Sequence, residues 1–177
     1  MTASETSDAP AAGGSLSTRP RIAPFLMIAL AVLAADQATK AIIRATIEPG
    51  GGWPSRGGLL RFSHVENSGA AFGILQGAGV FLVIPAVIAI VAVLVFVYTA
   101  PAGNRLYAVA LAFILGGATG NLVDRVTRGT VTDFIDPTHY PAFNLADSAI
   151  VLAVIALAWL SFREPDGDAV DDAEDGA

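Results

Sequence analysis

Four aspartates, Asp36, Asp124, Asp133 and Asp147, lie within or beside long apolar stretches of the sequence. Placing a carboxylate among apolar residues costs free energy, so such residues indicate a function. If Asp133 and Asp147 face each other, they can share one proton, because two like charges in close contact cannot both stay ionised. The ionised member is then a base for water and the protonated member an acid. This chemistry suits an aspartic hydrolase, but a small membrane protein that handles protons or ions would need similar residues.

The sequence offers neither a cysteine nor a metal-ligand cluster as a competing catalytic group. It contains no cysteine, which excludes disulfides, thiolate metal sites and cysteine nucleophiles. The two histidines, His64 and His139, stand far apart, and no H-E-x-x-H zinc motif is present. We therefore expect that the chemistry needs no metal and no cofactor.

Asp36 and Lys40 are candidates for supporting a site. They are four residues apart, so on a helix they share one face and can form an ion pair. A neutralised pair that orients the helix is the simpler interpretation, and direct chemistry is the alternative.

A glycine-rich segment carries a second polar group. Gly116 and Gly120 have the small-xxx-small spacing that lets helices approach closely. Packing explains the glycines but not the polar residues that follow them. Four residues recur at helical spacing and predict one polar stripe: Gly117, Asn121, Asp124 and Arg125. Asp124 and Arg125 are also consistent with ordinary interfacial charges at a helix end.

The composition predicts a membrane protein as the scaffold for these residues. The 177 residues are 54% hydrophobic and 15% charged, whereas a soluble domain has about 25% charged residues. The apolar runs predict an all-α protein with one four-span domain over 22–162. The expected transmembrane helices cover about 22–43, 80–100, 106–123 and 143–162. The uncharged part of the first run also fits the core of a cleavable signal peptide, but its removal would discard Asp36 and Lys40.

The two ends of the chain differ in composition from the rest. Residues 1–21 are rich in small residues and proline and predict a disordered tail. Residues 163–177 hold seven of the 16 acidic and one of the ten basic residues, so the remainder carries nine of each. We expect this end to be an acidic, disordered tail. No basic face indicates a nucleic-acid partner.

Two connections between the spans predict β-structure. Residues 45–79 and 126–142 each contain a strand-like alternation. With four spans, these connections lie on one side of the membrane, and the termini and the 101–105 turn lie on the other. All four aspartates therefore gather near one membrane face. The positive-inside rule counts four basic residues on the terminal side and six on the other, which does not settle the orientation.

Five short blocks of the sequence resemble the motif set of the lipoprotein signal peptidases, also called signal peptidase II. In chain order they are Asp36-Gln-Ala-Thr-Lys40, Asn67-Ser-Gly-Ala-Ala-Phe72, Gly116-Gly-Ala-Thr-Gly-Asn-Leu-Val-Asp-Arg125, Val131-Thr-Asp-Phe134 and Phe143-Asn-Leu-Ala-Asp147. The order of the blocks is that of the family. The resemblance extends from about residue 25 to 162 and leaves out only the two tails.

The resemblance implies an aspartic endopeptidase of the bacterial inner membrane with a small β-containing extracytoplasmic platform. Its partners would be membrane lipids and diacylated prolipoproteins, cut on the amino side of the lipidated cysteine. Asp133 and Asp147 would be the catalytic pair. Supporting or inhibitor-contacting positions would be Asp36, Lys40, Asn67, Gly117, Asn121, Arg125, Asn144 and Ala146. Both termini would be cytoplasmic, with the active site at the periplasmic or external face.

A small transporter or ion channel that uses the same carboxylates as a relay is the alternative. A relay needs ionisable groups at several depths of the membrane. The range 80–100 contains no acidic or basic residue, and the other spans carry theirs near one face. The sequence therefore favours the peptidase.

Overall fold

The computed structural model describes residues 22–55, 58–69, 79–99 and 105–163. The helices and strands in chain order are α1 (Ile22–Thr46), β1 (Gly52–Trp53), β2 (Leu60–Asn67), α2 (Gly79–Thr99), α3 (Arg105–Arg128), β3 (Val131–Pro137) and α4 (Leu145–Arg163). The expected fold, four transmembrane helices with a small sheet, is confirmed. The two tails predicted from composition lie outside the described residues, apart from Arg163 at the end of α4.

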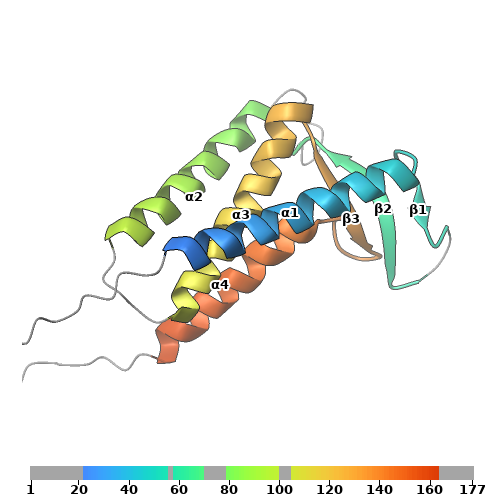
Figure 1. The fold of residues 1–177 in the computed structure, drawn as a ribbon. Coiled ribbons are helices and arrows are strands. Elements are labelled where there is room, and N and C mark those ends of the chain that lie inside the picture. Colours follow the sequence, from blue (N-terminus) through green and yellow to red (C-terminus); the bar gives the residue numbers. More distant parts are fainter. Residues whose placement is uncertain (1–21, 56–57, 70–78, 100–104, 164–177) are drawn as a thin grey trace, which may run out of the picture.

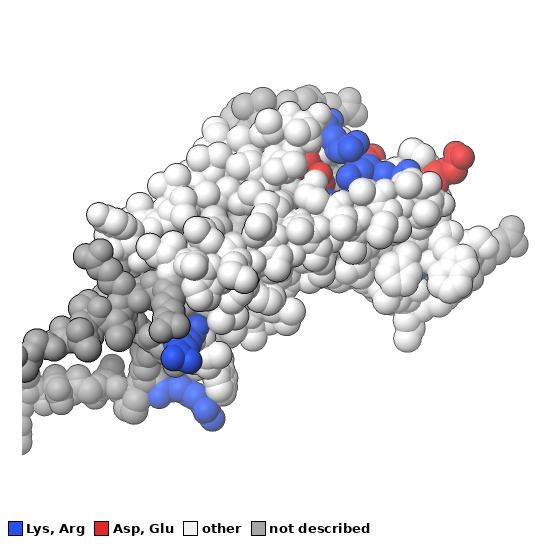
Figure 2. Space-filling model, in the orientation of Figure 1, with Lys and Arg blue, Asp and Glu red and all other residues white. Residues whose placement is uncertain are grey.

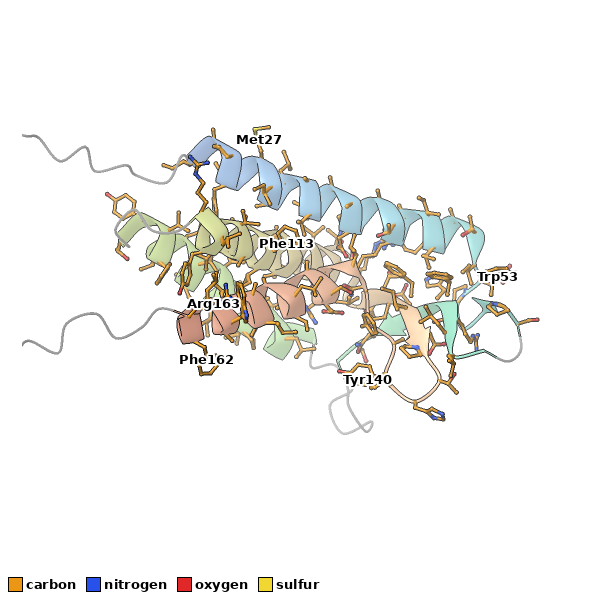
Figure 3. All side chains as sticks on the ribbon, turned by 90° about the horizontal axis from the view of Figure 1, so that it is seen from below. Met27, Trp53, Phe113, Tyr140, Phe162 and Arg163 are labelled. Carbon is orange, nitrogen blue, oxygen red and sulfur yellow. The ribbon has the colours of Figure 1, made fainter. Side chains whose placement is uncertain are left out.

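The helices turn apolar side chains outward. Leu30, Ile88 and Ile155 are 64%, 62% and 60% exposed, although each lies mid-helix. Figure 2 shows a broad face without charge between charged groups near the two ends of the molecule. In Figure 3, Met27 and Phe162 likewise point away from the bundle. An apolar exterior of this length suits hydrocarbon rather than water.

Helix α3 lies at the centre and packs against the three other helices (Figure 1). A Cβ atom on Gly116 would lie 2.5 Å from the carbonyl oxygen of Ala29 in α1. One on Gly117 would lie 2.6 Å from the carbonyl oxygen of Ala146 in α4. Both are closer than real Cβ contacts, so the glycines allow α1 and α4 to approach the α3 backbone. The packing role predicted for this glycine segment is confirmed.

Three helix boundaries differ by two or more residues from the sequence-based ranges, because apolarity and helicity end at different residues. Helix α1 continues three residues past 43 to Thr46. Helix α3 continues five residues past 123 to Arg128. It ends at Gly129, whose φ of 77° is left-handed and whose N–H donates to the Arg125 carbonyl at 3.0 Å. Helix α4 begins at Leu145 rather than 143, because Phe143 pairs instead with Ile135 of β3.

The sheet lies at one end of the helix bundle (Figure 1). Its order is β1-β2-β3, and both pairings are antiparallel. In the β2–β3 register, Val65 lies opposite Asp133, Glu66 opposite Thr132 and Asn67 opposite Val131. Because α3 leads into β3 and β3 leads into α4, the sheet joins the end of α3, which carries Asn121 and Asp124, to the start of α4, which carries Asp147.

Candidate active site

Lys40 is the centre of a buried polar cluster. Its Nζ lies 2.9 Å from Oδ2 of Asp36, 3.0 Å from Oδ2 of Asp124 and 2.9 Å from Oδ1 of Asn121. An ammonium group has three N–H donors, so all three are used. The Lys40, Asp36 and Asp124 side chains are almost fully buried. The expected pairing of Asp36 with Lys40 is therefore observed, and Asp124 is a buried partner rather than an interfacial charge.

Arg44 extends this cluster toward the sheet, and sequence reasoning missed it. Its Nη1 lies 3.8 Å from Oδ1 of Asp124 and donates to Oγ1 of Thr132 at 3.0 Å. With two cations and two carboxylates, the cluster is electrically balanced. A signal was present in the sequence, because Asp36, Lys40 and Arg44 follow at i, i+4 and i+8 and share one helix face.

Asn144 and Asp147 form a reciprocal cap at the start of α4. The N–H of Asp147 donates to Oδ1 of Asn144 at 3.0 Å, and the N–H of Asn144 donates to Oδ2 of Asp147 at 3.2 Å. This is the geometry of a capping box, with Asn144 before the first helical residue. Oδ1 of Asp36 accepts from the N–H of Ala146 at 3.0 Å. The cap fixes Asp147 at the helix N-terminus, where the helix dipole favours negative charge.

Asp133 and Asp147 are brought together through shared amide groups. Nδ2 of Asn144 donates to Oδ1 of Asp133 at 2.7 Å, and Nδ2 of Asn121 donates to Oδ1 of Asp147 at 2.7 Å. The two amides also meet, with Nδ2 of Asn144 at 3.1 Å from Oδ1 of Asn121. Nδ2 of Asn67, on β2, reaches Oδ2 of Asp133 at 2.8 Å. Each carboxyl oxygen of the pair thus accepts one N–H.

The Asp133 side chain holds its proton more tightly than an ordinary aspartate. Its pKa is raised from 3.8 to about 6, chiefly by burial and also by the negative charge of Asp147. The hydrogen bonds from Asn67 and Asn144, together with the charge of Lys40, act in the opposite direction. A carboxyl group with a pKa near 6 can exchange a proton close to neutral pH, as acid–base catalysis requires.

The remaining sequence candidates occupy different surroundings. Gly117 contacts α4 at Ala146, as described above. Nη1 of Arg125 donates to the Asn121 carbonyl at 3.4 Å, and Nε of Arg125 is buried without a hydrogen-bond partner among the described residues. The predicted single stripe on α3 is divided, because Asp124 bonds to α1 whereas Asn121 also bonds to α4.

The polar cluster should dominate the stability of the fold. In Lys40→Met, Asp36 and Asp124 lose their shared cation while still buried, which should lower the free energy of unfolding by about 3–5 kcal/mol. The matched control is Arg61→Met, because Arg61 and Asp136 form a half-exposed pair at 3.7 Å. That pair should contribute less than about 1 kcal/mol. Thermal unfolding in detergent measures both, and a Lys40→Met midpoint no lower than the control's would contradict the prediction.

The fold and the site define a class, a multi-pass membrane protein with paired carboxylates at one end of its helix bundle. Residues 28–163 match the family described as signal peptidase (SPase) II. The chain belongs to the signal peptidase II family, and it is therefore a protease and a multi-pass bacterial membrane protein.

Similar proteins support this membership. The lipoprotein signal peptidase of Moorella thermoacetica is 44% identical over 137 residues, which cover 77% of this chain and 91% of that protein. The lipoprotein signal peptidase of Bacillus subtilis is 37% identical over 137 residues, covering 75% and 89%. A solved bacterial membrane enzyme superposes with a TM-score of 0.76 at 32% identity, covering 85% of this chain and 99% of the other.

Proposed function

We propose that this protein is an aspartic endopeptidase that removes the signal peptide from diacylglyceryl-modified prolipoproteins, cutting on the amino side of the lipidated cysteine. Asp133 and Asp147 are its catalytic pair. The observation that carries the proposal is the link between the two carboxylates through Asn144, whose side chain bonds to Asp133 while its backbone N–H bonds to Asp147. Membership of the family supports prolipoproteins as the substrates.

The surroundings of the two carboxyl groups support different roles. Burial raises the pKa of Asp133 to about 6, which favours Asp133 as the member of the pair that carries the shared proton and acts as the acid. Asp147 lies at the N-terminus of α4 and accepts two N–H groups, which suits the ionised base. Asp147 takes a proton from water as the water oxygen bonds to the scissile carbonyl carbon, and Asp133 gives its proton to the carbonyl oxygen. When the carbon–nitrogen bond breaks, the leaving amine takes the proton held by Asp147, and one hydroxyl of the tetrahedral intermediate returns its proton to Asp133 as the carboxylic acid forms.

The supporting residues hold this pair rather than react. Asn121 and Asn144 orient the carboxylates, Asn67 fixes Asp133, and the cluster of Asp36 and Lys40 holds α1 against the start of α4. Preorganised donors of this kind cost no rearrangement during the reaction. Gly117 lets α4 approach α3 closely at Ala146, next to Asp147. Arg125 donates a hydrogen bond to the backbone carbonyl of Asn121.

The substrate defines the orientation that we propose. A prolipoprotein keeps the start of its signal peptide in the cytoplasm and exposes its lipidated cysteine at the outer surface. The sheet end, which carries Asp133, therefore faces the periplasm or the exterior, and both termini are cytoplasmic. In Figure 3, Trp53 and Tyr140 lie by the sheet and Arg163 lies at the far end of the bundle. Aromatic residues favour both membrane–water interfaces, so Trp53 and Tyr140 support a position of the sheet at a membrane surface.

A cleavage assay with the purified protein in detergent tests the function directly. A diacylated prolipoprotein should yield two products, and mass spectrometry should find the lipidated cysteine as the first residue of the larger one. Cleavage at any other bond would contradict the proposed specificity.

The relay alternative is not supported, because the described part of α2 carries no ionisable group except Tyr98 near its end. The chemistry therefore stays at one end of the bundle.

A further inference from the structure

Glu66 of β2 contacts three side chains on and beside the two strands β2 and β3, and β3 carries Asp133. Its carboxylate accepts hydrogen bonds from Oγ1 of Thr130 and, at 3.3 Å, from Oγ1 of Thr132, and lies 2.8 Å from Nε2 of His64. Thr132 is fully buried and immediately precedes Asp133. Because successive side chains of a strand point to opposite faces, Glu66 and Thr132 meet on one face of the sheet and Asn67 and Asp133 on the other.

This group is also fastened to the ends of two helices. Nδ1 of His64 lies 2.7 Å from the carbonyl oxygen of Ile47, one residue beyond α1. Thr132 accepts from Nη1 of Arg44 at 3.0 Å, and its N–H donates to Oδ2 of Asp124 at 3.4 Å. Burial raises the pKa of Glu66, but the hydrogen bonds from Thr130, His64 and Thr132 outweigh burial and hold that pKa below its ordinary value of 4.5. Glu66 is thus an ionised anchor between β2 and β3.

We propose that Glu66 is a positioning residue for Asp133. By tying Thr130 and Thr132 to β2, it fixes the register that places Nδ2 of Asn67 2.8 Å from Oδ2 of Asp133. The inference rests on the proposed catalytic role of Asp133. Glu66 does not touch the carboxyl pair and acts through the strand.

Loosening this anchor has a consequence that ordinary destabilisation does not have. The hydrogen bond from Asn67 lowers the pKa of Asp133. When that bond weakens, the pKa of Asp133 rises, and the Asp133 carboxyl group keeps its proton to a higher pH. The alkaline limb of the pH–rate profile should therefore move upward, while the maximal rate falls because the carboxyl group is less well placed.

The experiment compares pH profiles of kcat for lipidated prolipoprotein cleavage by the full chain and its variants. Glu66→Ala should lower kcat about tenfold with KM within about twofold, and should shift the alkaline limb upward by about 0.5 pH unit. Asn67→Ala removes the hydrogen bond from Asn67 to Asp133 directly, so its alkaline limb shows the largest shift that loss of this bond can cause. The double variant should shift no further than Asn67→Ala, because both changes act on one bond.

Two further variants make the test specific. Asp136→Asn is the matched control, since Asp136 is an acidic residue of the same strand whose one ion-pair partner among the described residues is half-exposed Arg61. It should leave both kcat and the limb unchanged. Glu66→Gln keeps an acceptor oxygen and should recover most of the rate, but a neutral amide holds Thr130 and Thr132 less tightly than a carboxylate. Its alkaline limb should therefore still lie above that of the wild type, by less than in Glu66→Ala, and this shift carries the test if Glu66→Ala does not fold.

The outcomes separate this inference from the proposed function. A normal alkaline limb in folded Glu66→Ala and Glu66→Gln, or an additive shift in the double variant, overturns the role of Glu66. If Asp133→Asn cleaves normally, the catalytic assignment itself is wrong. An inactive Asp133→Asn together with unshifted Glu66 variants rejects the positioning role alone.

Discussion

Asp133→Asn and Asp147→Asn are each expected to lower the rate of prolipoprotein cleavage by at least about 10³-fold. Each substitution leaves the shape of the side chain nearly unchanged but removes one member of the acid–base pair. The remaining carboxyl group cannot both activate water and protonate the carbonyl oxygen. Single-turnover rates of the purified variants measure the effect, with Asp136→Asn of the same strand as the control. Normal turnover by either active-site variant would reject the catalytic pair.

The same comparison includes a stability measurement with a defined pH dependence. The pKa of Asp133 is raised from 3.8 to about 6, so the folded state binds more protons than the unfolded state between these values, and stability falls as pH rises through them. An asparagine side chain cannot titrate, and Asp133→Asn should therefore unfold at a higher temperature than the wild type at about pH 7.5. The gain is at most about 3 kcal/mol, reduced by any lost hydrogen bond from Asn67. The difference should narrow toward about pH 4.5, and a difference that widens would contradict the raised pKa.

A prolipoprotein with a free cysteine thiol should be cleaved at least about 100-fold more slowly than the diacylated form. The extramembrane elements that the structure describes amount to a three-stranded sheet and short connections, which offer little surface for reading a long peptide. On the helix turns that carry Lys40 and Asp124, however, the apolar side chains Ile42 and Val126 are 60% and 69% exposed and suit acyl chains. Lipid bound there can contribute binding energy that places the scissile bond against Asp133 and Asp147.

The assay must separate recognition from simple concentration of substrate in the micelle. Each buried CH₂ adds about 0.8 kcal/mol of membrane affinity, so the two forms are compared at equal micellar concentration. A third substrate, with the thiol capped by a short alkyl group, tests whether removal of the thiol is sufficient. Equal rates for the lipidated and unlipidated forms would show that the acyl chains are not recognised, and the lipid specificity would have to be withdrawn.

Local features of the sequence were sufficient to predict the scaffold and most of the candidate residues. Apolar runs long enough to cross a membrane predict the helices, because hydrophobic length is a local property. The spacing of Asp36 and Lys40 predicts their ion pair, and the spacing of Gly116 and Gly120 predicts close helix packing, because neighbours on one helix face follow from periodicity alone. The motif order indicates the family, and the match over residues 28–163 confirms it.

The polar groups that meet in the site are set by the packing of the elements in three dimensions. Spacing along α3 places Asn121 and Asp124 on one stripe, but Asp124 binds Lys40 of α1 whereas Asn121 also reaches Asp147 of α4. Asn67 lies 66 residues before Asp133 and contacts it only through the β2–β3 register. No sequence pattern pointed to Glu66, because its three partners lie on its own strand and on or beside the facing one. Hydrogen bonds between elements depend on register and crossing geometry, which a residue pattern along one chain does not specify.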